Sequence, residues 1–108
     1  MARKETWIRV VTYSGGSSDP TEQQKYMDFT AETVVPVLKQ TEGCTLGYWG
    51  EDPTTGQMAA VTYWTSQEAI DAAKPSLAQF KEAREQLGMV QTGEYNFSLA
   101  RVSPFSAW

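Results

Sequence analysis

The side chains that could do chemistry in this chain are mostly aromatic. Two runs with strand-like composition, 44–51 and 57–64, are joined by a polar turn and contain Tyr48, Trp49, Tyr63 and Trp64. So many aromatic rings on adjacent strands of a 108-residue chain form either the core of the domain or the lining of an apolar pocket. The second interpretation predicts a binding site for a flat, apolar ligand.

The usual catalytic and metal-binding side chains are scarce. The chain contains no histidine, the commonest metal ligand and general base. Cys44 is its only cysteine, so we expect neither an intrachain disulfide nor a thiolate metal cluster. No two acidic residues have a spacing that points to an acid–base pair, and we interpret the acidic side chains as solvated. These observations predict a site with no metal and no cofactor.

Composition and charge argue against two classes of partner. The net charge is −4 and the basic residues are scattered, whereas nucleic-acid binding needs clustered Lys and Arg. No apolar run approaches the roughly 20 residues of a membrane span. Residues 1–5 lead directly into a strand pattern without the apolar core of a secretory signal. We therefore expect a cytoplasmic protein with no nucleic-acid and no membrane partner.

The first half of the chain predicts a strand, a helix and a hairpin. The run 6–13 is rich in β-branched and aromatic residues, which favours a strand. Asp19 is expected to cap the following helix, with Glu22 reaching back to the cap. Pro36 predicts a kink or a fresh short turn in this helix, and Gly43 predicts its end. The two aromatic strands of the hairpin come next.

The second half predicts a helix in two pieces and a last strand. Residues 65–68 have the pattern of a capping box that starts a short helix through Lys74. Pro75 begins a second helical piece that Gly88 ends. The last strand is expected over 90–102.

The resulting order, βαββαβ, is the ferredoxin-like pattern of an α+β domain, in which an antiparallel sheet has both helices on one face. We expect one domain over 1–103, followed by a C-terminal tail, 104–108, that contains Phe105 and Trp108. In the first and third strands both alternating sets of residues are largely apolar. Since a half-solvated sheet has one polar face, something besides the helices must cover the other face. A second copy of the chain is the expected cover, which predicts a homodimer; the alternative is a monomer whose extra aromatics are edge residues.

Three segments within 34–68 indicate a family: VVPVLKQTEGC, the hairpin GYWGEDPTTG, and VTYWTSQEA at the passage from strand to helix. They resemble the antibiotic biosynthesis monooxygenase-like group of dimeric α+β barrel proteins. The resemblance in motif is confined to this region, while the order of elements extends it over roughly 7–102. It implies a dimeric α+β barrel fold.

The resemblance also implies a possible activity, cofactor-independent monooxygenation of a phenol, anthrone or polyketide-type aromatic. A deprotonated phenol can pass an electron to dioxygen, so the protein need only bind the flat ring, favour the anion and exclude water. Trp64 matches a position of the family motif. On that basis Trp64 is a candidate catalytic residue. Position in the predicted strands and helices, rather than the motif, adds Asn96, Tyr63 and Tyr95 as catalytic candidates and Tyr48, Trp49, Phe80 and Tyr13 as candidate substrate-binding residues.

Two other functions remain open. The first is a non-catalytic small-ligand binding or interaction module that uses the same pocket, or the tail with Phe105 and Trp108. The second is haem degradation, known in the same superfamily, which the absence of histidine disfavours. The aromatic residues could also be core residues without a role in any site.

Overall fold

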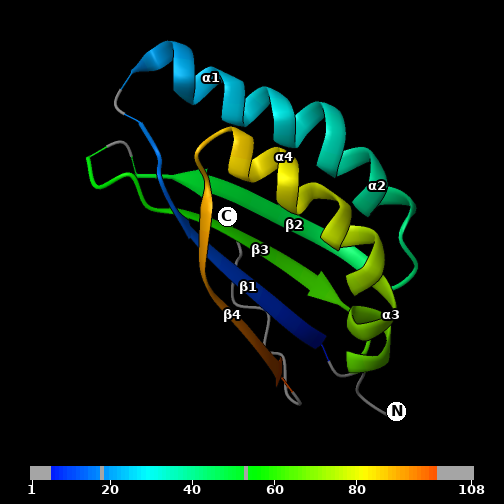
Figure 1. Cartoon of the computed structure of the whole chain (residues 1–108). Coiled ribbons are helices and arrows are strands. Elements are labelled where there is room, and N and C mark those ends of the chain that lie inside the picture. Colours follow the sequence, from blue (N-terminus) through cyan, green and yellow to red (C-terminus); the bar gives the residue numbers. More distant parts are fainter. Residues whose placement is uncertain (1–5, 18, 53, 100–108) are drawn as a thin grey trace, which may run out of the picture.

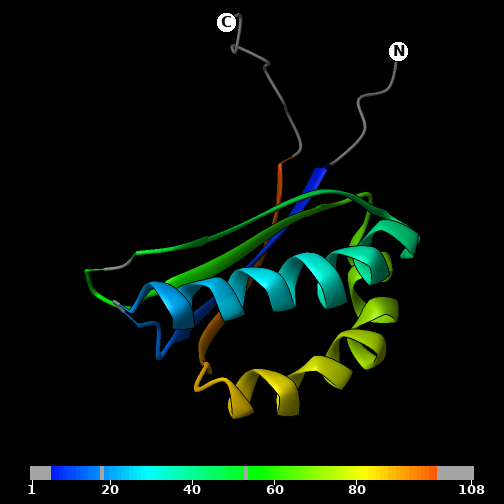
Figure 2. The ribbon, with the colours of Figure 1, turned by 90° about the horizontal axis from the view of Figure 1, so that it is seen from above.

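The protein is a four-stranded antiparallel sheet with its helices packed on one face (Figures 1 and 2). The computed structural model describes residues 6–17, 19–52 and 54–99. The observed elements are β1 (Thr6–Ser14), α1 (Pro20–Phe29), α2 (Val35–Gln40), β2 (Cys44–Glu51), β3 (Met58–Trp64), α3 (Gln67–Leu77), α4 (Lys81–Gln86) and β4 (Val90–Leu99). This order confirms the expected ferredoxin-like βαββαβ fold.

The strand order, β2-β3-β1-β4, places β1 and β3 in the middle of the sheet. Across these strands Trp7 pairs with Trp64, and Arg9 pairs with Thr62 on one side and Asn96 on the other. A register shift between β1 and β4 follows Thr12. Because side chains alternate between the two faces of a strand, this register sends Arg9, Thr62 and Asn96 toward the helices.

The helix starts follow from side-chain caps. The Asp19 carboxylate accepts a hydrogen bond from the Thr21 backbone N–H at 2.9 Å, as expected of an N-cap. Glu22, however, forms an ion pair with Lys25 rather than reaching back to the cap. At the second helix Ser66 is the N-cap, and its hydroxyl accepts a hydrogen bond from the Ala69 N–H at 3.1 Å.

Of the two prolines within the helical segments, Pro36 lies at an irregular turn, as expected, whereas Pro75 does not end its helix. A π-helical turn, Thr30–Val34, joins α1 to α2 immediately before Pro36, and this wider turn accommodates the helical hydrogen bond that proline cannot donate. Helix α3 does not end at Lys74 but runs through Pro75 to Leu77. The break comes later, in the 3₁₀ turn Ala78–Phe80 that leads into α4.

Two clusters of buried residues form the core between sheet and helices. One lies where α3 meets the sheet and includes Trp64, Ile70, Leu77 and Phe80. Phe80 also packs edge-on against Phe29, with ring centroids 6.3 Å apart. The second cluster lies at the other end of the sheet and comprises Val11, Tyr13, Tyr26, Met58 and Met89.

The face of the sheet opposite the helices is apolar and exposed. Its exposed large hydrophobic residues come from the two edge strands: Leu46, Tyr48, Tyr95, Phe97 and Leu99. A sheet that is solvated on one face normally has polar residues there. The sequence expectation that both faces are largely apolar therefore agrees with the structure.

In the described part of the chain, no helix has the length and apolar character needed to cross a membrane. The expected tail 104–108, with Phe105 and Trp108, lies outside the described residues, as does the expected last strand beyond Leu99.

Candidate functional site

A cavity of about 1200 Å³ lies between the sheet and the helices. All four strands contribute to its lining, together with the helical segments α2, α3 and α4 and the turn before α2. Its apolar wall includes Val34, Leu38, Trp49, Leu77 and Met89. The cavity is larger than the roughly 300 to 1,000 Å³ typical of small-molecule sites, so it can accept a polycyclic ligand.

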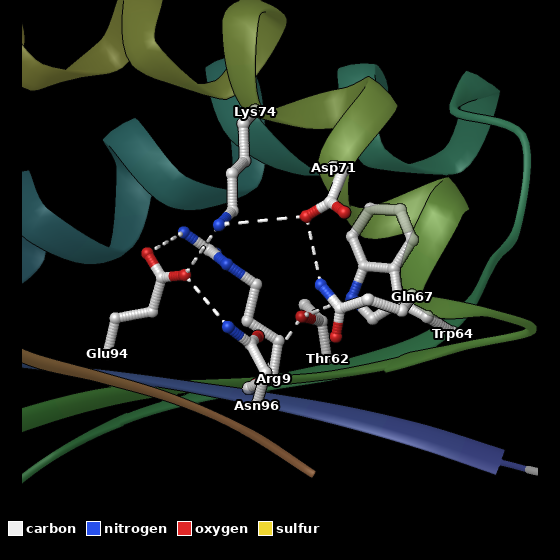
Figure 3. A network of polar contacts seen from close by, with 8 residues as sticks. All are labelled: Arg9, Thr62, Trp64, Gln67, Asp71, Lys74, Glu94 and Asn96. Atoms are coloured by element: carbon white, nitrogen blue, oxygen red, sulfur yellow. Dashed lines mark hydrogen bonds and ion pairs between the residues drawn. The ribbon is translucent and has the colours of Figure 1, made fainter. Parts of the chain in front are cut away.

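One side of the cavity holds a network of charged side chains centred on Glu94 of β4 (Figure 3). The Arg9 Nη2 lies 3.2 Å from Glu94 Oε1, and the Lys74 Nζ lies 3.4 Å from Oε2. The Asn96 amide donates a further hydrogen bond to Oε2 at 3.0 Å. Asp71, also near Lys74, extends the network along α3.

The surroundings of Glu94 fix its protonation state. The hydrogen bond from Asn96 lowers the pKa of this carboxyl group most, and the charges of Arg9 and Lys74 lower it further against the opposing effect of burial. Glu94 is therefore a carboxylate at neutral pH and a weak base.

A second charged group, Arg84 of α4, faces the cavity beside Tyr13. The Arg84 Cζ lies 5.2 Å from the centre of the Tyr13 ring and 5.7 Å from that of Phe80, within the range of cation–π contact. Burial raises the pKa of Tyr13, although the charges of Arg84 and Arg9 oppose this. The Tyr13 hydroxyl consequently stays protonated at neutral pH and is available to donate a hydrogen bond to a ligand.

The structure places some of the residues that the sequence suggested for the site in the cavity and others on the opposite face of the sheet. Tyr13 and Trp49 contribute to the cavity lining from the helix side of the sheet. Tyr48 also borders the cavity, but its pairing with Val61 puts its exposed side chain on the helix-free face. Alternation along the strands places the Tyr63 and Tyr95 side chains on the opposite face of the sheet. The hairpin aromatics thus do not gather in one pocket, because neighbouring residues of a strand face opposite ways.

The other candidates lie beside the cavity rather than in its lining. Trp64 is 1% exposed in the core, and its indole N–H donates to the Thr62 hydroxyl at 2.8 Å. Thr62 in turn lines the cavity. Phe80 is a core residue beneath Arg84. Asn96 is adjacent to Glu94 and donates a hydrogen bond to its carboxylate.

Sequence reasoning missed the charged residues that line the cavity, above all Arg9, Lys74, Arg84 and Glu94. One signal could have found the first of them. Arg9 occupies a helix-facing position of β1 between Trp7 and Val11, and a charge in such an apolar row needs a partner. The partnership of Arg9 with Glu94 depends on the β1–β4 register, which the sequence does not display.

Among the described residues, no group of three or more His, Cys, Asp or Glu side chains could hold a metal ion. The single cysteine, Cys44, contributes to the cavity lining. Burial raises the pKa of its thiol, which makes it a poor nucleophile and metal ligand at neutral pH.

Comparison with solved structures shows that the same fold occurs in several oxygenases. A monooxygenase from the gene ActVA-Orf6 of Streptomyces coelicolor, solved with the ligand nanaomycin D, is 17% identical, with a TM-score of 0.66 over 92% of this chain and 89% of that one. SnoaB, a cofactor-independent oxygenase from Streptomyces nogalater, is 13% identical, with a TM-score of 0.64 over 94% and 99%. A dimeric ferredoxin-like protein from an uncultured marine organism is also 13% identical, with a TM-score of 0.61 over 94% and 92%.

These similarities confirm, at the level of fold, the resemblance to antibiotic biosynthesis monooxygenases that the sequence indicated. No protein-family model matches the chain, and no curated protein matches it in sequence. At these identities the comparisons establish a shared architecture, whereas activity has to be argued from the site.

Proposed function

We propose that this protein is a cofactor-independent monooxygenase-like enzyme that acts on a planar phenol or anthrone. The observation that carries the proposal is the large cavity between sheet and helices, which combines an apolar, partly aromatic wall with several cationic side chains. A flat ring system can pack against the apolar wall. The cations can stabilise the ring's deprotonated form, which is the form that reacts with dioxygen.

The cavity residues support distinct roles in this reaction. Trp49 offers an aromatic face for stacking. The protonated Tyr13 hydroxyl and the nearby Arg84 guanidinium favour negative charge on a substrate oxygen. Trp64 and Asn96 act as positioning residues in this proposal, because they hold Thr62 and Glu94 respectively rather than line the cavity.

For an anthrone the reaction balances without a further reductant. The substrate loses a proton, which leaves to solvent because Glu94 is a weak base. The anion gives one electron to dioxygen, and the two radicals combine to form a carbon–oxygen bond. The resulting peroxide anion takes up one proton from solvent. The hydroperoxide then loses water and becomes a ketone, so one oxygen atom remains in the quinone product and the other leaves as water.

Oxygen consumption with anthrone, measured together with anthraquinone formation, tests this proposal. The wild-type protein should accelerate both, at one dioxygen per quinone. Tyr13→Phe should lower the rate by about tenfold or more, since removing one oxyanion donor costs on the order of 10²–10³ in favourable cases.

Tyr95→Phe is the matched control, because it removes a hydroxyl from the opposite face of the sheet. It should leave the rate unchanged. A rate that falls in Tyr95→Phe but not in Tyr13→Phe would place the chemistry outside this cavity. Absence of catalysed oxygen consumption with anthrone and with phenols of similar size would refute the enzyme proposal.

A non-catalytic binding module is the second candidate, favoured by one specific observation. The carboxylate in the cavity is already occupied by Arg9, Lys74 and Asn96, and its pKa is lowered. Such a group is poorly suited to remove a proton from a bound phenol. Tight binding of planar phenols without oxygen consumption would support this function instead.

We further propose that the chain works as a homodimer, with the two sheets packed through their helix-free faces. The exposed apolar residues of that face support the proposal, as does the fold shared with a dimeric ferredoxin-like protein. An interface of the obligate class buries on the order of 2,000 Å² or more.

A further inference from the structure

The charge of the cavity is opposite to that of the whole chain. The protein has nine basic and thirteen acidic residues and a net charge of −4. Among the residues that the structure describes, five basic side chains line the cavity, whereas Glu85 and Glu94 are the only acidic ones that do. The cavity therefore has an excess of three positive charges within an acidic protein.

Part of this excess is balanced within the protein. Arg9 and Lys74 both contact Glu94, at 3.2 Å and 3.4 Å. Among the described residues, Lys39, Lys81 and Arg84 have no carboxylate within ion-pair distance. The unbalanced charge thus lies on α2 and α4, on the helical side of the cavity.

Of these three unpaired charges, that of Arg84 is the least favourable in free energy. Its side chain is half-buried between the rings of Tyr13 and Phe80, and it lines the cavity. Burial lowers the pKa of Arg84, which shows that its surroundings disfavour the charge. Cation–π contacts compensate only partly for a buried charge, and an anion at hydrogen-bonding distance compensates more fully.

Lys81 lies on the same side of α4, three residues before Arg84, and also lines the cavity. Residues three apart are neighbours on a helix surface, so the ammonium and the guanidinium can act on one ligand group. A guanidinium binds a carboxylate through two parallel hydrogen bonds, and a lysine nearby adds a second charge.

We propose that the cavity selects planar aromatic compounds that bear a carboxylate, and that Arg84 and Lys81 bind this carboxylate while the ring system packs against the apolar wall. The inference rests on the proposed function, since it assumes that the cavity is where the aromatic ligand binds. It narrows the substrate class from planar phenols in general to aromatic acids.

Two stable probes of equal shape test the inference, 9,10-anthraquinone-2-carboxylate and the neutral 9,10-anthraquinone-2-carboxamide. Titration followed by calorimetry or tryptophan fluorescence gives a Kd for each. We expect the wild-type protein to bind the carboxylate about tenfold or more tightly than the amide, as expected when charge-assisted hydrogen bonds replace neutral ones.

Substitutions of Arg84 and Lys81 test whether these two side chains cause the preference for the carboxylate probe. Arg84→Gln should reduce the ratio of the two Kd values toward one while the amide Kd changes by less than about twofold, and Lys81→Gln should reduce the ratio less. Arg84→Lys should retain part of the preference because it keeps the charge. Lys25→Gln removes the same charge from the exposed surface of α1, where Lys25 pairs with Glu22, and should leave both Kd values unchanged.

The outcomes separate this inference from the proposed function. Binding of both probes with equal affinity overturns the carboxylate subsite and leaves the proposed function standing. A preference that survives in both Arg84→Gln and Lys81→Gln also overturns it, because the charge is then recognised elsewhere. If neither probe binds to the wild-type protein, both the inference and the proposed function fail.

Discussion

At the scale of single residues, Trp64 shows that a residue packed beside the cavity need not belong to the cavity lining. The sequence suggested Trp64 as a catalytic candidate, and the structure places its ring in the core with its N–H on Thr62. Trp49, on the neighbouring strand, lines the cavity instead. The two tryptophans should therefore respond to substitution in opposite ways.

Trp64→Phe should lower the free energy of unfolding by about 1 to 3 kcal/mol, because Thr62 loses a buried hydrogen bond and the core loses volume. Its affinity for an anthraquinone probe should stay within about twofold. Trp49→Leu should weaken that affinity by roughly two- to tenfold through lost stacking, at a smaller loss of stability. Urea unfolding and ligand titration on both variants provide the check. If binding weakens only in Trp64→Phe, the Trp64 ring belongs to the site.

The same comparison explains what the sequence could predict about the site. Residue types predicted an aromatic site, and two of the suggested rings, Tyr13 and Trp49, lie in the cavity lining on the helix side of the sheet. The charged cluster was not predictable, because it depends on bringing Arg9 and Glu94 together from strands 85 residues apart in sequence. Such a contact is fixed by the register between strands, and a single sequence contains no direct signal of that register.

At the scale of elements, the order of strands and helices was predictable because its signals are local. The caps at Asp19 and Ser66 and the strand composition of β2 mark their elements within a few residues. Proline positions were less informative. Helix α3 continues through Pro75 because packing of Ile70, Ala73 and Leu77 against the sheet holds the backbone in place.

Three loops meet through glycine backbones at the end of the sheet near Tyr13. The Gly16 N–H donates to the Gly56 carbonyl at 2.9 Å, which ties the β1–α1 loop to the β2–β3 hairpin. Gly15 has a φ of 96°, and a Cβ atom there would overlap the Gly88 carbonyl oxygen of the α4–β4 loop. Only glycine allows this approach without strain.

Gly15→Ala should lower the free energy of unfolding by about 2 to 4 kcal/mol, since it adds both left-handed backbone strain and a clash with backbone atoms. Gly50→Ala is the matched control, because its Cβ would meet nothing within 4 Å and its φ is not positive. That change should stay within about 1 kcal/mol. Urea unfolding at one protein concentration compares the two, and equal losses would show that the loop contact does not contribute to stability.

At the scale of the whole molecule, charge and apolar surface are separated by the sheet. The cationic cavity lies on the helix side, and most of the exposed large apolar residues lie on the other side. Dimerisation through the apolar face would leave the cavity of each copy intact. The fold with its two apolar sheet faces could be predicted from strand alternation, which is a property of the sequence alone. The charge of the cavity could not, because five scattered basic residues become neighbours only in the folded chain.

Light scattering at micromolar concentration should give about twice the 12.0 kDa mass of the chain. Phe97→Asp places a charge within the proposed interface, where it would lack a partner, and should shift the mass toward that of a monomer. Met27→Asp makes the same kind of change at an exposed apolar residue of α1 and should leave the dimer intact. A monomeric wild-type protein would contradict the dimer, and dissociation by Met27→Asp alone would move the interface to the helices.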